Sequence, residues 1–226
     1  MGRKKSNRKS SLSKAQKKAM TKIARKVVDE EIEDKSLVTT FENVQLFHNK
    51  PGYTQKLLAV VNGTDDGDQS TAGNGVKTIR VGDQISLKNV NIRFWLSNKL
   101  DRPNVMYKGV LFWYPTGIPV NDAYVFKTQT NKMLDRYNDK QIQIIDTFIV
   151  KSTNNYAVDA NNHEHSYLAT LNKSYKNKKI TYDGLTGFPK GKDLGFCIVC
   201  YDAYGTLQTD NIASFAWQSL ITFQDA

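Results

Sequence analysis

The residues most able to bind metals or do redox chemistry are few, because the 226-residue chain has three histidines and two cysteines. His163 and His165 flank Glu164 in NNHEHSY, a spacing unlike that of a zinc-binding helix, and no third ligand is evident. Cys197 and Cys200 lie in the apolar run LGFCIVCY. Residues three apart on a strand point to opposite faces, so these thiols cannot share a metal or form a redox pair. We expect the cysteines in the core and the histidines in a surface loop.

The carboxylates do not form a more convincing metal or catalytic site than the histidines and cysteines. Asp65, Asp66 and Asp68 surround Gly67 in a polar tract that could hold Ca²⁺, but the loop lacks the twelve-residue spacing and terminal Glu of an EF-hand. A solvated turn is the favoured interpretation. The sequence also lacks a glycine-rich phosphate loop, a nucleophile elbow and a paired-carboxylate motif. It therefore predicts a protein without enzymatic activity, metal or cofactor.

Positive charge is confined to one end of the chain. Residues 1–26 contain eleven basic and no acidic residues, whereas the whole chain has 32 basic and 22 acidic residues, leaving 21 and 22 for the rest. The eleven cations are Arg3, Lys4, Lys5, Arg8, Lys9, Lys14, Lys17, Lys18, Lys22, Arg25 and Lys26. Such an arm is typical of binding to a polyanion, because each cation that meets a phosphate releases a condensed counterion. A solubilising tail or a nuclear-import signal in RKKSNRK is the alternative, and import is compatible with nucleic-acid binding.

The arm has helical periodicity from Ser11 onward, with Ser11 or Ser13 as the expected N-cap. Its apolar positions recur three or four residues apart and alternate with lysines on the other face: Leu12, Ala15, Ala19, Ile23 and Val27. Such a helix could lie on a membrane surface or pack against copies of itself. The alanine-rich apolar face without aromatic residues argues against the membrane, and the chain has no apolar run of 18 residues.

After Ser36 the period changes to two, which predicts strands in the remaining 190 or so residues. The expected strands are 38–47, 53–61, 85–96, 105–114, 124–127, 142–150, 167–171, 194–201 and 212–223. The strongest one changes phase at Lys88-Asn89, which predicts a β-bulge, and 105–114 is apolar on both faces, as in a buried central strand. These patterns indicate two parts: an arm over residues 1–36, and an all-β sandwich or barrel over residues 37–226.

Four segments resemble a known family. GNGVKTIRVGDQISLKNVNIRFWLS (73–97) resembles the strand-B region of coat proteins from circular, Rep-encoding single-stranded DNA viruses, with its R-x-G-x-x-I-x-L-K-x-(V/I)-x-I-R pattern. VMYKGVLFWYPTGIP (105–119) looks like their next apolar strand, residues 131–150 are similar to a loop leading into a strand, and SFAWQSLITFQDA (214–226) resembles their last strand. The satellite tobacco necrosis virus coat protein is similar over the same elements, including a basic helical arm.

The resemblance implies a single jelly roll of eight antiparallel strands in two four-stranded sheets. It implies a virion protein whose sixty copies form a T=1 icosahedral shell, with the arms inside on a single-stranded genome. Host import machinery and a cell receptor are further expected partners, assembly would occur in the host nucleus or cytoplasm, and no membrane is involved. Lys88 and Arg93 are expected to join the eleven arm cations in binding nucleic acid, and Arg80 is a weaker candidate.

Two other functions remain open at this point. One is a single-stranded nucleic-acid-binding protein that forms no shell, and the other is a lectin-like attachment protein. The long connections 62–75, 115–123 and 151–166 favour a coat protein over a small binding module. An attachment protein would not need the basic arm.

Overall fold

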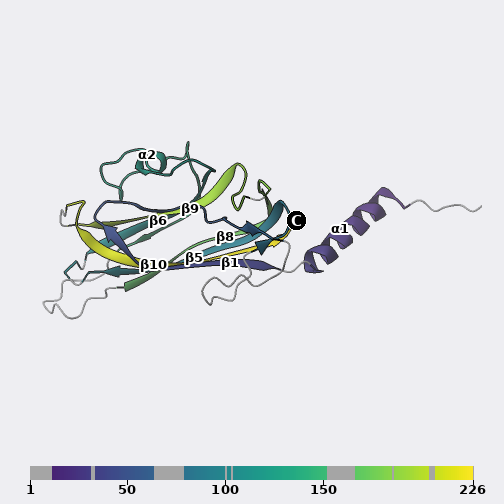
Figure 1. The fold of residues 1–226 in the computed structure, drawn as a ribbon, viewed down its shortest axis with the longest axis horizontal. Helices are drawn as coiled ribbons and strands as arrows, with labels where there is room; N and C mark the ends of the chain where they lie inside the picture. The colour runs from purple at the N-terminus through teal and green to yellow at the C-terminus, as the bar shows by residue number, and fades with distance from the viewer. Residues whose placement is uncertain are drawn as a thin grey trace, which may run out of the picture. The chain divides into compact units, whose positions relative to one another are not determined.

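The chain divides into two compact units, Met1–Asp34 and Lys35–Ala226. The computed structural model describes residues 12–31, 34–63, 79–99, 101–102, 104–151, 166–184, 186–203 and 207–225. The first unit contains one helix, α1, and the second contains all the strands and the short helix α2 (Figure 1). Lys35 and Ser36, which the sequence analysis placed in the arm, belong to the first strand.

Helix α1 spans Lys14–Glu31 and begins at a capping box. The Gln16 backbone N–H donates to the Ser13 hydroxyl over 3.2 Å, and the Ser13 backbone N–H donates to the Gln16 side chain over 2.9 Å. This reciprocal pair satisfies two backbone donors that a helix start leaves unpaired. Ser13 is therefore the N-cap, one of the two residues expected for that role.

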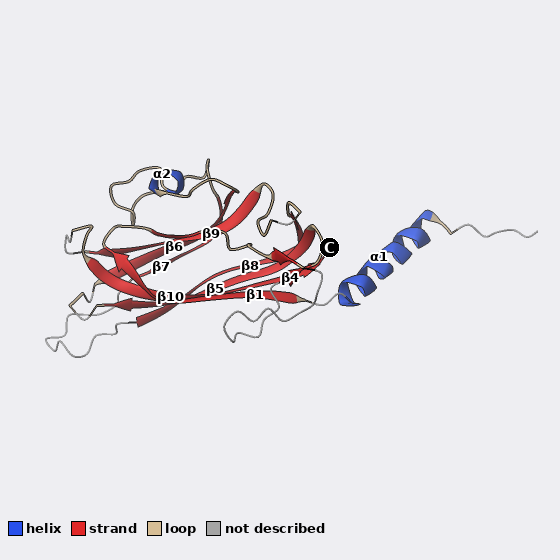
Figure 2. Cartoon of the chain, in the orientation of Figure 1, coloured by secondary structure: helices blue, strands red, loops and turns tan. Residues whose placement is uncertain are grey.

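The described residues of the second unit form ten strands, most of them long (Figure 2). They are β1 Lys35–Phe47, β2 Gly52–Thr54, β3 Val61–Asn62, β4 Ile79–Arg80, β5 Gln84–Asn98, β6 Val105–Pro115, β7 Gln143–Val150, β8 Ser166–Thr181, β9 Lys192–Asp202 and β10 Asn211–Asp225. Sheet 1 has the order β1-β10-β5-β8, and sheet 2 has the order β2-β9-β6-β7. Strands β3 and β4 form a separate parallel pair.

The strand order defines the fold. Without the short pair β3–β4, the first, eighth, third and sixth strands form sheet 1, and the second, seventh, fourth and fifth form sheet 2, with every pair antiparallel. Two facing four-stranded sheets with this order are a jelly roll. The predicted fold class is confirmed. Strand β5, whose sequence resembles a first jelly-roll strand, is the third.

The two sheets differ in how they are covered. The main core fills the space between them, and includes Ile92, Phe94, Leu111, Phe196 and Phe223. A second cluster lies on the other face of sheet 2, where α2 and its flanking loops cover the sheet; its buried members are Val110, Phe112, Tyr114, Val120, Val125, Phe126, Ile142, Cys197 and Val199. Strands β6 and β9 of sheet 2 are thus buried on both faces, as predicted for 105–114, whereas the outward-pointing residues of β5 in sheet 1, such as Arg93 and Trp95, are exposed.

Two local predictions can be compared with the strands directly. The bulge is at Lys88, because Leu87 pairs with Phe223 and Asn89 pairs with Thr222. Cys197 and Cys200 are both buried free thiols and belong to the clusters on opposite faces of sheet 2. Both predictions are confirmed.

Two predicted strands were wrong in part. Residues 124–127 overlap helix α2, Asp122–Val125, because the Asn121 side chain accepts the Tyr124 backbone N–H over 3.0 Å and caps a helical turn. Of the predicted 53–61 strand, only residues 53–54, in β2, and 61, in β3, are extended. Lys56 has a φ of 61°, and the turn that follows buries Leu57 and Leu58 in the main core.

Candidate nucleic-acid interface

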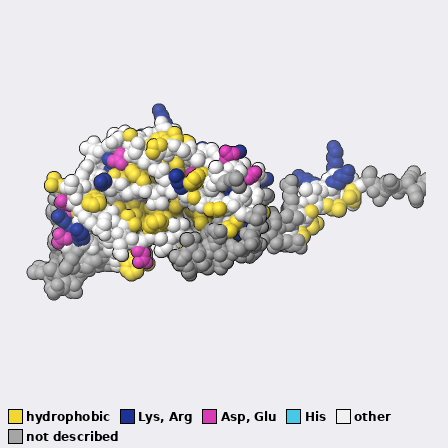
Figure 3. Space-filling model, viewed as in Figure 1, with side chains coloured by type: hydrophobic (Ala, Val, Ile, Leu, Met, Phe, Trp, Pro, Cys, Tyr) yellow, Lys and Arg dark blue, Asp and Glu magenta, His cyan; other side chains and the backbone are white. Residues whose placement is uncertain are grey.

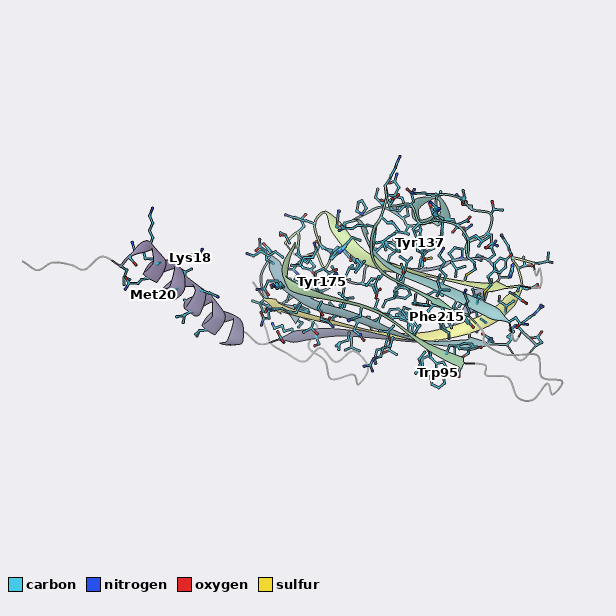
Figure 4. All side chains as sticks on the ribbon, turned by 180° about the vertical axis from the view of Figure 1, so that it is seen from behind. Lys18, Met20, Trp95, Tyr137, Tyr175 and Phe215 are labelled. Carbon is cyan, nitrogen blue, oxygen red and sulfur yellow. The ribbon has the colours of Figure 1, made fainter. Side chains whose placement is uncertain are left out.

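Four of the predicted arm cations have described side chains, and all four are exposed on α1: Lys14, Lys17, Lys18 and Lys22. They recur at spacings of three or four residues, so they share one side of the helix. Met20 and Ile23 are 56% and 63% exposed. Basic and apolar side chains of the helix gather on different sides (Figure 3). Lys18 and Met20 accordingly point to opposite sides (Figure 4). The lysine face therefore presents four positive charges, and residues 12–24 around it contain no acidic residue.

The side chains of the other seven arm cations lie outside the described part of the structure. Arg3, Lys4, Lys5, Arg8 and Lys9 lie outside the described residues, and so do the side chains of Arg25 and Lys26, whose backbones are in α1.

Lys88 and Arg93 lie on β5, a central strand of sheet 1. Arg93 is exposed and pairs in register with Gln218 of β10 and Thr170 of β8, so its side chain shares the outer face of the sheet with theirs. Lys88, at the bulge, is half-buried, and its Nζ donates to the Asn177 side chain over 2.6 Å. Both residues therefore lie on one strand, as expected from the sequence.

Arg80, the weaker candidate, is a structural residue. Its guanidinium is 0% exposed and donates to the backbone carbonyls of Val60, Gly184 and Thr186 over 3.3, 2.8 and 3.0 Å, and to that of Gly82. It also stacks on the Tyr182 ring at 4.2 Å. A guanidinium committed to four carbonyls inside the protein cannot reach a phosphate, so the prediction for Arg80 was wrong.

Sheet 1 carries a second concentration of positive charge, which was not predicted from the sequence. The four strands of sheet 1 contain seven basic and two acidic residues, whereas those of sheet 2 contain two basic and three acidic residues. Four of the basic residues are on β8, the edge strand: Lys173, Lys176, Lys178 and Lys179. The near-neutral total for residues 27–226 therefore conceals a positive sheet 1. Counting charge per strand rather than per domain would have found it.

An exposed tryptophan was also missed. Trp95 is 58% exposed on the outer face of sheet 1, whereas Trp113 and Trp217 are 3% and 5% exposed. Figure 4 shows Trp95 pointing away from the sandwich while Phe215 points between the sheets. The signal was present in the alternation of 90–96, because Phe94 and Leu96 are inward residues and the residue between them must face outward.

Two further lysines are buried and serve the fold. Lys108 lies 4.5 Å from the Tyr137 ring, and its Nζ donates to the carbonyls of Lys132 and Asp135 over 3.1 and 2.7 Å. Burial lowers the pKa of Lys108, and Asp135 opposes that shift. The Lys132 ammonium lies 3.4 Å from the Asp122 carboxylate. These cations hold the loop of residues 126–137 on sheet 2 and are not available to a polyanion.

Within the described part of the chain, no three His, Cys, Asp or Glu side chains come together as metal ligands would, and α1 is too polar to cross a membrane. His48 is buried, the Asp202 backbone N–H donates to its Nδ1 over 3.2 Å, and burial lowers its pKa. The segments with Asp65, Asp66 and Asp68, and with His163 and His165, lie outside the described residues.

No protein-family model and no curated protein matches the chain. Among solved structures, it is similar to a chain of Mud crab tombus-like virus, with 12% identity over 86% of this chain and 90% of that chain and a TM-score of 0.38. A chain of Desmodium yellow mottle tymovirus gives 11% identity, 86% and 88% coverage and a TM-score of 0.37. A chain of the empty head of turnip yellow mosaic virus has 11% identity over 86% of this chain and 82% of that chain, with a TM-score of 0.36. The jelly-roll assignment rests on strand order and pairing.

Proposed function

We propose that this chain is the coat protein of a small icosahedral virus and that its basic arm packages a single-stranded genome. The observation that carries the proposal is the separation of positive charge from the folded domain. Eleven cations without an acidic residue occupy residues 1–26, and they precede a compact jelly roll whose own sequence is near neutral. A protein that must face a polyanion on one side and solvent on the other needs charge segregated in this way.

The finer proposal is a T=1 shell of sixty copies with the arms inside. Sixty copies of eleven cations supply about 660 positive charges, which offsets a large share of the phosphates of a genome on the order of a thousand nucleotides. The near-neutral jelly roll allows neighbouring subunits to approach without strong repulsion. The motifs of 73–97 and 105–119 favour a circular, Rep-encoding single-stranded DNA virus, and RKKSNRK would then also serve nuclear import during assembly.

The arm cations are proposed to contact phosphates, which makes binding independent of sequence. In α1 these are Lys14, Lys17, Lys18 and Lys22, and Arg93 and Lys88 on sheet 1 would add contacts. A receptor would be met by the outer surface of the shell.

A single-stranded nucleic-acid-binding protein without a shell is the second candidate, favoured by the same arm. Nuclease protection separates the two. Full-length protein is mixed with a circular single-stranded DNA and treated with nuclease, and intact DNA recovered from fast-sedimenting particles supports the coat. DNA that is bound but digested, with protein sedimenting as small complexes, supports the second candidate.

A further inference from the structure

The outer face of sheet 1 combines polar side chains with exposed apolar ones, which include Leu168, Leu220 and the aromatic ring of Trp95. Around Trp95 on β5, the register places Ala216 of β10 on one side and Leu168 of β8 on the other. Two residues along the same strand, Arg93 has Gln218 and Thr170 as its neighbours. The ring thus has apolar neighbours on both adjacent strands, and an amide and a hydroxyl group lie two residues along the sheet.

The surface is hollowed on both sides of the ring. One open depression of about 470 Å³ is lined by Trp95, Val150, Ser166, Tyr167 and Leu168. A second, of about 280 Å³, is lined by Trp95, Ser97, Ser214, Phe215, Ala216, Asn43 and Glu42. Trp95 is the residue common to both, so a planar group can approach its ring from either hollow.

We infer that Trp95 is a stacking site for an unpaired base of single-stranded nucleic acid, with Arg93 as the contact for a neighbouring phosphate. Side chains two apart on a strand lie on the same face about 7 Å from each other. Proteins that bind single strands without sequence preference combine such aromatic platforms with cationic tracks. The inference rests on the proposed function and adds a base-binding site on the jelly roll to the phosphate-binding arm.

Charge decides between nucleic acid and a second copy of the chain as the occupant. Strands β5 and β8 contain six basic and no acidic residues, but not all of them face outward. Lys173 and Lys178 pair with the inward Val90 and Leu87, and the Lys178 ammonium lies 4.9 Å from the Trp113 ring. Arg93 and Lys179 pair with Thr170 and Ser86 on the outer face. A second copy packed face to face through this surface would bring two sets of these cations together, which like-charge repulsion disfavours. Glu42, at the far rim of the smaller hollow, is the one acid among the residues lining the two hollows. A polyanion is the complementary partner.

The test uses full-length protein and tryptophan fluorescence. Because Trp113 and Trp217 are buried, acrylamide-accessible emission comes from Trp95, and Trp95→Phe supplies the baseline. Oligo(dT) should quench the Trp95 component, whereas polyphosphate of the same charge should bind the arm without quenching it. Trp95→Ala should weaken oligo(dT) binding five- to a hundredfold, the usual range for one stacked base, and Trp95→Phe should restore most of it.

The salt dependence of binding distinguishes the contribution of base stacking from that of phosphate contacts. Trp95→Ala should leave the slope of log affinity against log salt unchanged, whereas Arg93→Gln should make it shallower by about 0.7. Ile149→Ala on β7 is the matched control, because Ile149 is also 58% exposed and should not alter binding.

Two results would overturn the inference. The first is unchanged oligo(dT) affinity in Trp95→Ala together with no quenching of the Trp95 component in the wild type. The second is loss of acrylamide access to Trp95 in particles that hold no nucleic acid, which would assign the face to another subunit. Either result, with particle formation and arm binding intact, leaves the proposed coat function standing. Absence of both particles and nucleic-acid binding would remove the proposed function itself.

Discussion

The Lys35 ammonium lies 2.6 Å from the Asp225 carboxylate, so an ion pair joins the first residue of β1 to the last residue of β10. The other Asp225 oxygen accepts the Val81 backbone N–H over 3.1 Å, and Lys35 also donates to the Ile79 carbonyl over 3.4 Å. Lys35 is 7% exposed. The pair therefore links the start of the jelly roll, its last strand and the segment that follows β4.

Asp225→Asn should destabilise the jelly roll by about 1–3 kcal/mol, because it removes the carboxylate charge that lies 2.6 Å from a largely buried ammonium. Urea unfolding of the variant measures the loss. Lys35→Met tested alone and with Asp225→Asn completes a double-mutant cycle, in which the double variant should lose less than the sum of the two. Additive losses would mean that the two residues do not interact.

A buried carboxyl predicts a dependence of stability on pH. Asp193 is 1% exposed and accepts the backbone N–H groups of Leu58 and Leu194 over 3.1 and 2.6 Å, while its Oδ2 has no hydrogen-bond partner among the described residues. Burial raises its pKa to about 6, against 3.8 for the free group, and the two backbone hydrogen bonds and Lys56 oppose that shift.

Between these two values the folded state holds a proton that the unfolded state has released, so stability must fall as pH rises from about 4 to about 6. Two pKa units correspond to about 3 kcal/mol as an upper bound. Asp193→Asn should abolish this fall. Its unpartnered amide adds a cost that does not vary with pH, so the measurement is the difference in unfolding free energy between wild type and variant across pH 4–7. A constant difference would contradict the assignment.

The two arginines of the β4–β5 region should respond to substitution in opposite ways. Arg80→Gln should lower the free energy of unfolding by about 3 kcal/mol or more, because several buried carbonyls lose a charged donor. Arg93→Gln, on the exposed face, should change stability by less than about 0.5 kcal/mol. Chemical denaturation of both variants checks this, and equal losses would contradict the assigned roles.

The arm lysines predict a change in the salt dependence of nucleic-acid binding. Replacing Lys14, Lys17, Lys18 and Lys22 by Gln keeps helix propensity nearly constant and removes four charges. The slope of log affinity against log salt should become shallower by up to about 3, equally for unrelated DNA and RNA sequences. Substituting Ala15, Ala19 and Ile23 by Ser changes the other face and should leave the slope unchanged. An unaltered slope in the lysine variant would leave import as the role of the arm.

Periodicity predicted much of this fold because most strands alternate or are apolar throughout. The bulge at Lys88 and the separation of Cys197 from Cys200 follow from side-chain direction alone, and the structure has both. The strand predicted at 124–127 was wrong because Tyr124 and Val125 are residue types that favour strands. The helical turn depends instead on one side-chain hydrogen bond from the Tyr124 backbone N–H to the Asn121 cap, which periodicity does not reveal.

The site was harder to predict than the fold. Arg80 and Arg93 are both cations near the strongest strand, and only three-dimensional structure shows that carbonyls from 60, 82, 184 and 186 surround the first. The charge of sheet 1 was hidden because strands distant in sequence, β5 and β8, are neighbours in the sheet. Local sequence reports the direction of a side chain but not which distant segments it meets.

Self-assembly tests the central claim most directly. Purified full-length protein, mixed with single-stranded DNA at neutral pH and moderate salt, is examined by negative-stain electron microscopy and analytical ultracentrifugation. The account predicts closed particles of uniform diameter with a mass about sixty times the 25.6 kDa of one chain, plus the packaged DNA. A protein that stays monomeric at high concentration with nucleic acid bound would contradict it.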